Sequence, residues 1–227
     1  FFVQQLNQLG KKIICHYHGE DLRSRGVMPY IDRLADLNLT NEVDLLSKHP
    51  NIEYIFLPFD TSPFNVKDTI SDVLKISHAP TNRFYKGSNH IIKVCEKLEN
   101  QGKIKFDLIE NLPHSQAMER KSKSDIFIDQ LGNKGGWGYG MNSVESLSMG
   151  ICTLTEMNDA YDSFIPDHPF VSIKEQTLES EIETLIRNKD RILEFGKKGR
   201  EWVQKYHDIK QVSNTLYDYY KKIGLLD

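Results

Sequence analysis

The sequence has few cysteines, no excess of basic residues and no long apolar run, and each shortage excludes a class of protein. Cys15, Cys95 and Cys152 are odd in number and scattered, which favours reduced thiols in a cytoplasmic setting over a disulfide framework. A formal net charge of −3 is too close to neutral for non-specific nucleic-acid binding, so no nucleic-acid partner is expected. No apolar stretch approaches the roughly 18 residues that span a bilayer, and the N-terminus lacks the pattern of a signal peptide.

What the sequence contains is typical of a folded chain of one to two domains. Its 227 residues are 39% apolar and 27% charged, a balance that excludes a disordered protein. The chain begins at Phe1 inside an amphipathic stretch, 1–9, which ends at Gly10, a residue suited to a helix C-cap. We therefore expect a segment of a longer protein.

Short apolar runs alternate with helical periods along the chain. The runs expected to form strands are 12–16, 52–57, 73–78, 104–109, 125–129, 151–154 and 170–173. A helix is expected around 29–37, and the tail, 202–224, is expected to be helical. From Val73 to Ile186 the strand–helix order repeats about five times, which predicts an α/β fold: a Rossmann-like parallel sheet with helices on both faces.

A boundary between two α/β domains is expected near 60–67, where Pro58 and Pro63 lie close by. The sequence thus predicts a partial domain over 1–65 and a complete one over 66–227. Because ligands bind beyond the carboxyl ends of parallel strands, the residues that follow each expected strand are the candidates for function.

The loop after 73–78 carries Arg83, Lys86 and Gly87 and leads into an expected helix. Arginine and lysine side chains at a helix N-terminus suit phosphate oxygens. The alternative is a solvated loop with a turn glycine.

The glycine-rich loop after 125–129 leads into an expected helix over 141–150. Gly138 and Gly140 would let the backbone approach a ligand, while Trp137 and Tyr139 would shape a pocket. Glu145, about one turn inside the helix, could accept hydrogen bonds from vicinal hydroxyls. The alternative is a flexible loop before an ordinary helix.

Two further segments are candidates. After 104–109, the backbone of Asn111 and Leu112 is suited to a base edge, whereas His114 is more simply a structural residue. After 12–16, His16 and His18 point to the same face of an extended segment, and His18 is a candidate active-site group. The neighbouring acidic residues suggest zinc, but no second cluster has the spacing of a structural zinc site, so no metal is expected.

Several of these segments together resemble a known family. The segments 77–87 (SHAPTNRFYKG), 124–126 (SDI) and 136–150 (GWGYGMNSVESLSMG) resemble the C-terminal nucleotide-sugar domain of family-4-type glycosyltransferases, which have the GT-B fold. The segment 196–207 is similar to the helix that closes that domain. The segments 18–23 and 57–60 resemble the end of the N-terminal, acceptor-side domain, so the resemblance covers most of the chain.

The resemblance implies a role for each matching residue. Arg83 and Lys86 would contact the donor diphosphate and serve catalysis, and His18 would face the donor sugar. Glu145 matches the second Glu of the family's Glu-x7-Glu motif, which binds ribose. The first Glu falls at Trp137, a departure from the pattern. The remaining contacts are Gly87, Asn111, Leu112, Gly138, Tyr139 and Gly140 for the nucleotide, and Trp137, Met141 and Asn142 for the sugar.

The resemblance further implies a retaining, metal-independent transferase without a cofactor. It would move a hexosyl-type sugar from a nucleotide sugar to a glycan, lipid or protein acceptor, as in polysaccharide biosynthesis. Arg83, Lys86 and helix amides would stabilise the diphosphate leaving group. Peripheral association with the inner membrane stays open, although no basic amphipathic helix demands it. As a segment, this chain is expected to bind donor weakly and to transfer nothing by itself.

Other readings of the sequence stay open. One is a non-catalytic subunit that holds a nucleotide or stabilises an active partner, which Trp137 favours. A nucleotide-sugar epimerase is weaker because its carboxylate arrangement is not found. A flavodoxin-like receiver is weaker still, because His78 and its neighbours stand where the acidic cluster should be.

Overall fold

The computed structural model describes residues 2–134, 138–165 and 167–227, and it divides the chain into two compact units. One unit combines 2–58 with 206–227, and the other spans 59–205. The division falls close to the boundary expected at 60–67. The tail, however, lies with the first unit, whereas the sequence grouped it with the donor domain over 66–227.

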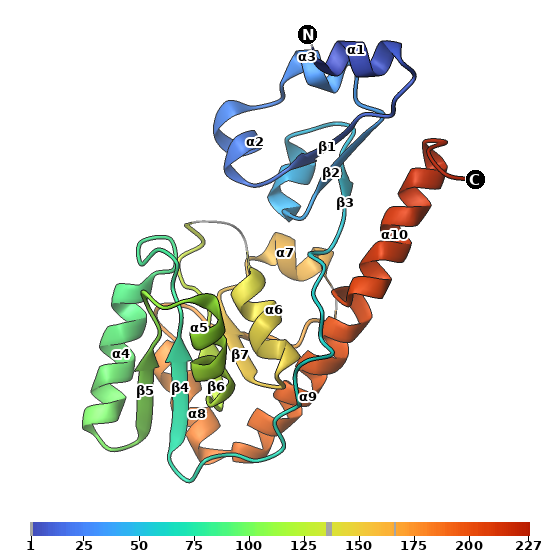
Figure 1. Cartoon of the computed structure of the whole chain (residues 1–227). Helices are drawn as coiled ribbons and strands as arrows, with labels where there is room; N and C mark the ends of the chain where they lie inside the picture. Colours follow the sequence, from blue (N-terminus) through green and yellow to red (C-terminus); the bar gives the residue numbers. More distant parts are fainter. Residues whose placement is uncertain (1, 135–137, 166) are drawn as a thin grey trace. The chain divides into compact units, whose positions relative to one another are not determined.

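The first unit is built on a parallel sheet of β1 (Ile14–Tyr17), β2 (Leu37–Thr40) and β3 (Glu53–Tyr54), in that order (Figure 1). Its other N-terminal elements are α1 (Phe2–Gln8), α2 (Glu20–Arg25), α3 (Pro29–Asp32) and the 3-10 helix η1 (Val43–Ser47). The expectation of a helix around 29–37 is wrong beyond Asp32. Leu37 instead begins a strand whose residues are all buried, a setting in which β pairing replaces helical hydrogen bonds.

The tail joins the first unit because its last helix has an apolar stripe that matches the sheet. Helix α10 (Ile209–Lys222) buries Val212 against Leu37, Leu39 and Ile55. The Tyr219 hydroxyl also donates a 3.0 Å hydrogen bond to the carbonyl oxygen of Tyr54. The tail was expected to be helical over 202–224, but the structure interrupts it: one helix ends at Tyr206 and α10 begins at Ile209.

The second unit is a parallel sheet in the order β5-β4-β6-β7-β8, which confirms the predicted Rossmann-like α/β fold (Figure 1). Its strands are β4 (Leu74–His78), β5 (Ile104–Leu108), β6 (Ile126–Ile128), β7 (Cys152–Thr155) and β8 (Val171–Ser172). Its helices are α4 (Ser88–Asn100), α5 (His114–Ser122), α6 (Met141–Ser148), α7 (Asp159–Phe164), α8 (Leu178–Arg187) and α9 (Lys189–Tyr206).

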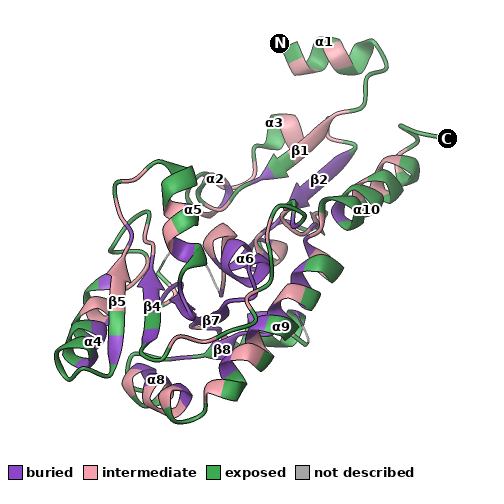
Figure 2. Ribbon diagram, turned by 60° about the horizontal axis from the view of Figure 1, so that its bottom comes forward, coloured by how far each residue is buried: buried purple, intermediate pink, exposed green. Residues whose placement is uncertain are grey.

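Helices cover both faces of this sheet. Ile126 and Ile128 pack with apolar residues of α4 and α8, while Phe127 packs with Met118 of α5 on the opposite face. The alternation follows from the two-residue repeat of a strand. Figure 2 shows the buried strands at the centre and the exposed outer surfaces of the helices.

The strand order reverses beside β4, because the chain runs from β4 outward to β5 and then returns to β6 on the other side. Open α/β sheets bind ligands at such a switch point, beyond the carboxyl ends of the strands.

Among the described helices, none combines the length and the apolar character needed to cross a membrane.

Candidate functional site

A cavity of ≈ 540 Å³ lies beyond the carboxyl ends of β4 and β5 and reaches α5 and α6. It brings together residues that the sequence analysis selected from three separate segments. These residues are Arg83, Asn111, Leu112, Met141, Asn142 and Glu145. The switch point of the sheet thus carries a cation, backbone polar groups and a carboxylate around one space.

Arg83 is held by Glu110, the residue two positions after β5. Nε donates to Oε1 at 2.8 Å and Nη2 donates to Oε2 at 2.5 Å, a two-pronged ion pair. These hydrogen bonds lower the pKa of the Glu110 carboxyl below its usual value. The Arg83 side chain is still 52% exposed, so an anion can reach it.

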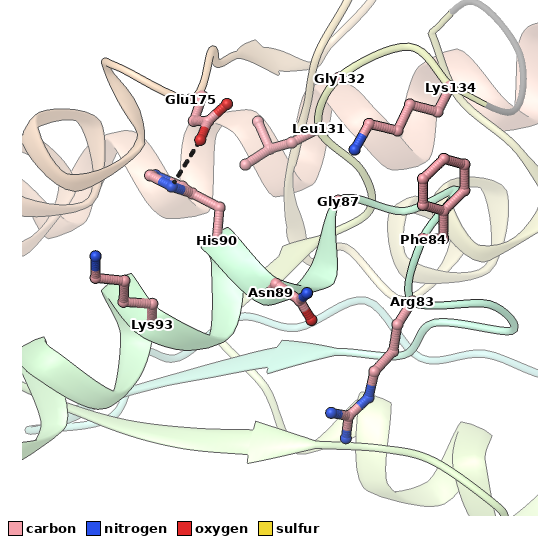
Figure 3. A pocket seen from close by; sticks show the side chains of 10 residues that line it. All are labelled: Arg83, Phe84, Gly87, Asn89, His90, Lys93, Leu131, Gly132, Lys134 and Glu175. Atoms are coloured by element: carbon pink, nitrogen blue, oxygen red, sulfur yellow. Dashed lines mark ion pairs between the residues drawn. The ribbon is translucent and has the colours of Figure 1, made fainter.

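Arg83 also borders a second cavity, of ≈ 340 Å³, at the start of α4. Figure 3 shows His90 paired with Glu175, Lys134 beside Phe84, and the Arg83 guanidinium pointing away from these groups. The Lys134 ammonium lies 4.8 Å from the centre of the Phe84 ring. Arg83 is therefore the residue that the two cavities share.

Lys86 belongs to a network around Asp129, the residue directly after β6. Its ammonium lies 2.5 Å from Asp129 Oδ1, and the second carboxylate oxygen accepts from Ser143 Oγ at 2.6 Å and from the Gly140 amide at 3.3 Å. Burial alone would raise the pKa of Asp129, but Lys86 and these donors hold it below its usual value. The network fixes Lys86 against the start of α6.

Two of the selected glycines have a steric reason to be glycine. Gly87 precedes α4 with φ 63°, and a β-carbon there would lie 2.5 Å from the Leu131 carbonyl oxygen. Gly138 has φ 113°, and a β-carbon there would lie 3.0 Å from the Met157 sulfur and from Cγ of Tyr161. Both positions favour glycine, whereas a β-carbon at Gly140 would make only an ordinary 4.0 Å contact with the Lys86 ammonium.

Glu145 lines the cavity with both carboxylate oxygens engaged. Oε2 lies 2.5 Å from the Lys121 ammonium, and Oε1 lies 2.9 Å from His114 Nε2. The Lys121 side chain is 1% exposed, whereas the His114 side chain is 74% exposed. One oxygen of Glu145 is thus fixed inside the protein, and the other meets an exposed ring.

The other selected residues lie apart from this cavity or outside the described residues. The Tyr139 ring packs against Tyr161, Phe170 and Trp202, and the Gly138 carbonyl accepts a 2.7 Å hydrogen bond from Thr155. Trp137 lies outside the described residues.

His18 lies in the first unit, directly after β1. It stacks on His16 with ring centres 4.3 Å apart, as expected for alternate residues of an extended segment. Within the described ranges, no group of three or more His, Cys, Asp or Glu side chains is arranged to hold a metal ion.

Three residues that organise the site were missed by sequence reasoning: Glu110, Asp129 and Lys121. Glu110 and Asp129 follow β5 and β6 within two residues, so inspecting the carboxylates after each strand would have found them. Lys121 does not follow a strand, and it lies in a basic run that also contains the exposed Lys123. The sequence therefore does not single it out.

No family model matches the sequence. No curated protein matches it either. Several solved structures, however, are similar to the fold of this chain. HepE from Anabaena, solved with UDP and glucose, superposes with a TM-score of 0.68 at 11% identity, over 97% of this chain and 74% of that one.

Two other solved structures are similarly related. An α-glucosyltransferase, solved with UDP and a 13-mer DNA, gives a TM-score of 0.69 at 14% identity, over 97% of this chain and 75% of that one. Sucrose-phosphate synthase from Thermosynechococcus elongatus gives 0.68 at 12% identity, over 98% of this chain and 70% of that one. At such identities the likeness concerns the fold, and the chain has the α/β fold of GT-B glycosyltransferases, as its motifs predict.

Proposed function

We propose that this chain binds a nucleotide-activated sugar in the cavity beyond β4 and β5, and that the protein transfers the sugar to an acceptor. The observation that carries the proposal is the convergence of Arg83 and Glu145 on one cavity at the switch point. An arginine suits a diphosphate and a carboxylate suits ribose hydroxyls. Structural neighbours solved with UDP support a nucleoside diphosphate as the common part of the donor.

The proposed reaction is retaining and metal-independent. As the bond between the anomeric carbon and the leaving oxygen breaks, negative charge grows on the nucleoside diphosphate. Arg83 and Lys86 would stabilise that charge, together with the amides at the start of α6. His18 would face the transferred sugar from the acceptor side. The acceptor would be a glycan, a lipid or a protein.

Binding is tested by calorimetry with UDP, ADP, GDP and their sugar conjugates. We expect at least one nucleoside diphosphate to bind, and Arg83→Ala to weaken its binding about tenfold or more. Arg187→Ala, at the end of α8, is the matched control and is expected to leave the affinity unchanged. Failure of every nucleoside diphosphate and nucleotide sugar to bind would contradict the proposal.

Catalysis is tested by the release of nucleoside diphosphate from the bound nucleotide sugar, with and without added acceptors. Release or transfer that His18→Ala reduces while donor affinity stays unchanged would support an enzyme.

A second candidate is a non-catalytic subunit that binds the nucleotide or stabilises an active partner. Trp137 favours it, because this residue stands where the family motif has its first Glu. Tight donor binding without hydrolysis or transfer, in any length of the protein, would support this candidate over the enzyme.

A further inference from the structure

Lys121 of α5 is a cation withdrawn from water at the wall of the proposed nucleotide cavity. Its side chain is 1% exposed, and its ammonium lies 2.5 Å from Glu145 Oε2 and 2.7 Å from Asn142 Oδ1. The same ammonium lies 4.7 Å from the centre of the Phe127 ring. Burial lowers the pKa of Lys121, and the attraction of Glu145 opposes that shift.

Both partners of Lys121 lie on the first turns of α6 and line the cavity. Asn142 is fixed a second time, because its amide donates a 3.0 Å hydrogen bond to the Ala79 carbonyl oxygen. Lys121 therefore ties α6 to α5 at the point where α6 meets the loop after β4. An arrangement with this many short contacts leaves the Glu145 side chain little rotational freedom.

The two oxygens of Glu145 differ in what a ligand could displace. Oε2 accepts from Lys121, whose side chain is 1% exposed. Oε1 is 2.9 Å from Nε2 of His114, whose largely exposed ring can turn away. A hydroxyl that donates to Oε1 would take the place of the His114 nitrogen and leave the Lys121 contact intact.

We propose that Lys121 is a positioning residue that holds Glu145 with Oε1 directed at the ribose hydroxyls of a nucleoside diphosphate. This inference rests on the proposed function. The Lys121 ammonium is already engaged by Glu145 and Asn142, so it acts through Glu145 by fixing one oxygen and so orienting the other. The preference of the protein for a ribose over a sugar that lacks the 2′ and 3′ hydroxyls then depends on the buried Lys121.

The test compares the affinity for UDP with that for 2′,3′-dideoxy-UDP, which lacks both ribose hydroxyls, on the 227-residue chain. The native protein is expected to prefer UDP by about 10- to 100-fold, since a hydrogen bond to a charged group is lost with the hydroxyls. Lys121→Met is expected to reduce this preference to about threefold or less, while the affinity for dideoxy-UDP changes little. A change in stability alone would not alter the ratio.

Two further variants make the comparison specific. Lys123→Met removes an exposed lysine of the same segment, paired with Glu119, and is expected to keep the full preference. Lys121→Gln keeps a polar group in the buried position and is measured if the methionine variant does not fold; the same loss of preference is expected. Glu145→Gln should lose the preference too, and adding Lys121→Met to it should cause no further loss.

The outcomes separate the inference from the proposed function. If native protein binds UDP and the Lys121 variants keep the full preference, the inference is wrong and the proposed function stands. The same holds if native protein binds UDP and its dideoxy analogue equally well. If UDP does not bind, the comparison is made with ADP or GDP and their dideoxy forms, and failure of all of them contradicts both.

Discussion

Arg83 and Glu110 face each other across the loops that follow β4 and β5, joined by hydrogen bonds of 2.8 and 2.5 Å. The carboxylate meets the guanidinium in the two-pronged geometry that a phosphate would use. Because Glu110 and a diphosphate would compete for the same donors, donor binding must displace or share this contact. Glu110 is thus an internal competitor for the anion that Arg83 is proposed to bind.

Replacing Glu110 with Gln should therefore strengthen the binding of nucleoside diphosphate. The change removes a negative charge from the cavity wall and frees Arg83, and we expect the affinity to rise about two- to fivefold, as suits a partly solvated pair. Calorimetry with UDP measures it. The control is Glu183→Gln on α8, which removes the charge that pairs with Lys103 and should leave the affinity unchanged. A weaker affinity in Glu110→Gln would show that the carboxylate assists binding.

Lys86→Ala should both weaken catalysis and destabilise the fold. If Lys86 only contacted the leaving group, its loss would leave the fold intact, but the structure pairs Lys86 with Asp129, which is 1% exposed. Removing the cation leaves a buried carboxylate without its partner, which costs about 3 kcal/mol of unfolding free energy. The loss of the proposed leaving-group contact should lower kcat about 10²- to 10³-fold. Denaturant unfolding and product release measure the two effects.

The double variant Lys86→Ala with Asp129→Asn separates these effects. Neutralising the carboxyl removes the unpaired charge, so the stability should largely recover while transfer stays low. If activity returned together with stability, Lys86 would have a structural role only, and the assignment to the diphosphate would be wrong.

The sequence predicted the sheet of the second unit well because its strands are short, continuous apolar runs. Such runs mark strands buried on both faces, as Ile126 and Phe127 are. Arg83 and Glu145, which the sequence analysis selected because they follow two such strands, line one cavity in the structure. Local pattern was sufficient wherever the answer depended on one segment and its period.

Pairings between distant segments could not be predicted in the same way. The apolar stripe of α10 shows that the helix packs on something, but Val212 does not specify which sheet lies beneath it. In the same way, Lys121 and Lys123 both lie in the basic run 120–123, and the composition of that run does not separate them. Only the position of Glu145 on another helix makes one of them a buried ion-pair partner.

The stability of the chain should fall as the pH falls from 7 toward 5, because of two buried histidines. Burial lowers the pKa of His78 and that of His207 to about 4 from an ordinary value of 6.5. His78 lies 2.8 Å from the Ile128 carbonyl oxygen and from the Ser88 hydroxyl, and His207 lies 2.7 Å from the Leu57 carbonyl oxygen. These contacts suit neutral rings.

The sign follows from where the protons bind. Between the two pKa values the unfolded chain takes up a proton that the folded chain does not, so acid favours unfolding. Each histidine should cost about 2 kcal/mol between about pH 7 and pH 5. Denaturant unfolding at both pH values measures it. His78→Gln should reduce the loss by about that amount, whereas His114→Gln, at an exposed ring, should not. Equal losses in native protein and His78→Gln would contradict the prediction.

Gly87→Ala should destabilise the second unit and weaken donor binding together. Gly87 precedes α4 with a left-handed φ of 63°, and an added β-carbon would lie 2.5 Å from the carbonyl oxygen of Leu131. Gly102→Ala is a matched control, because Gly102 has a φ of 71° but no atom within 4 Å of its would-be β-carbon. Backbone strain alone costs about 1–2 kcal/mol in both variants. The additional loss in Gly87→Ala, measured by denaturant unfolding, then reports the contact with Leu131.

Because the loop before Gly87 carries Arg83 and Lys86, the shift that relieves this contact should also lower the affinity for nucleoside diphosphate. An affinity equal to that of Gly102→Ala would mean that the loop holds its cations without this close approach.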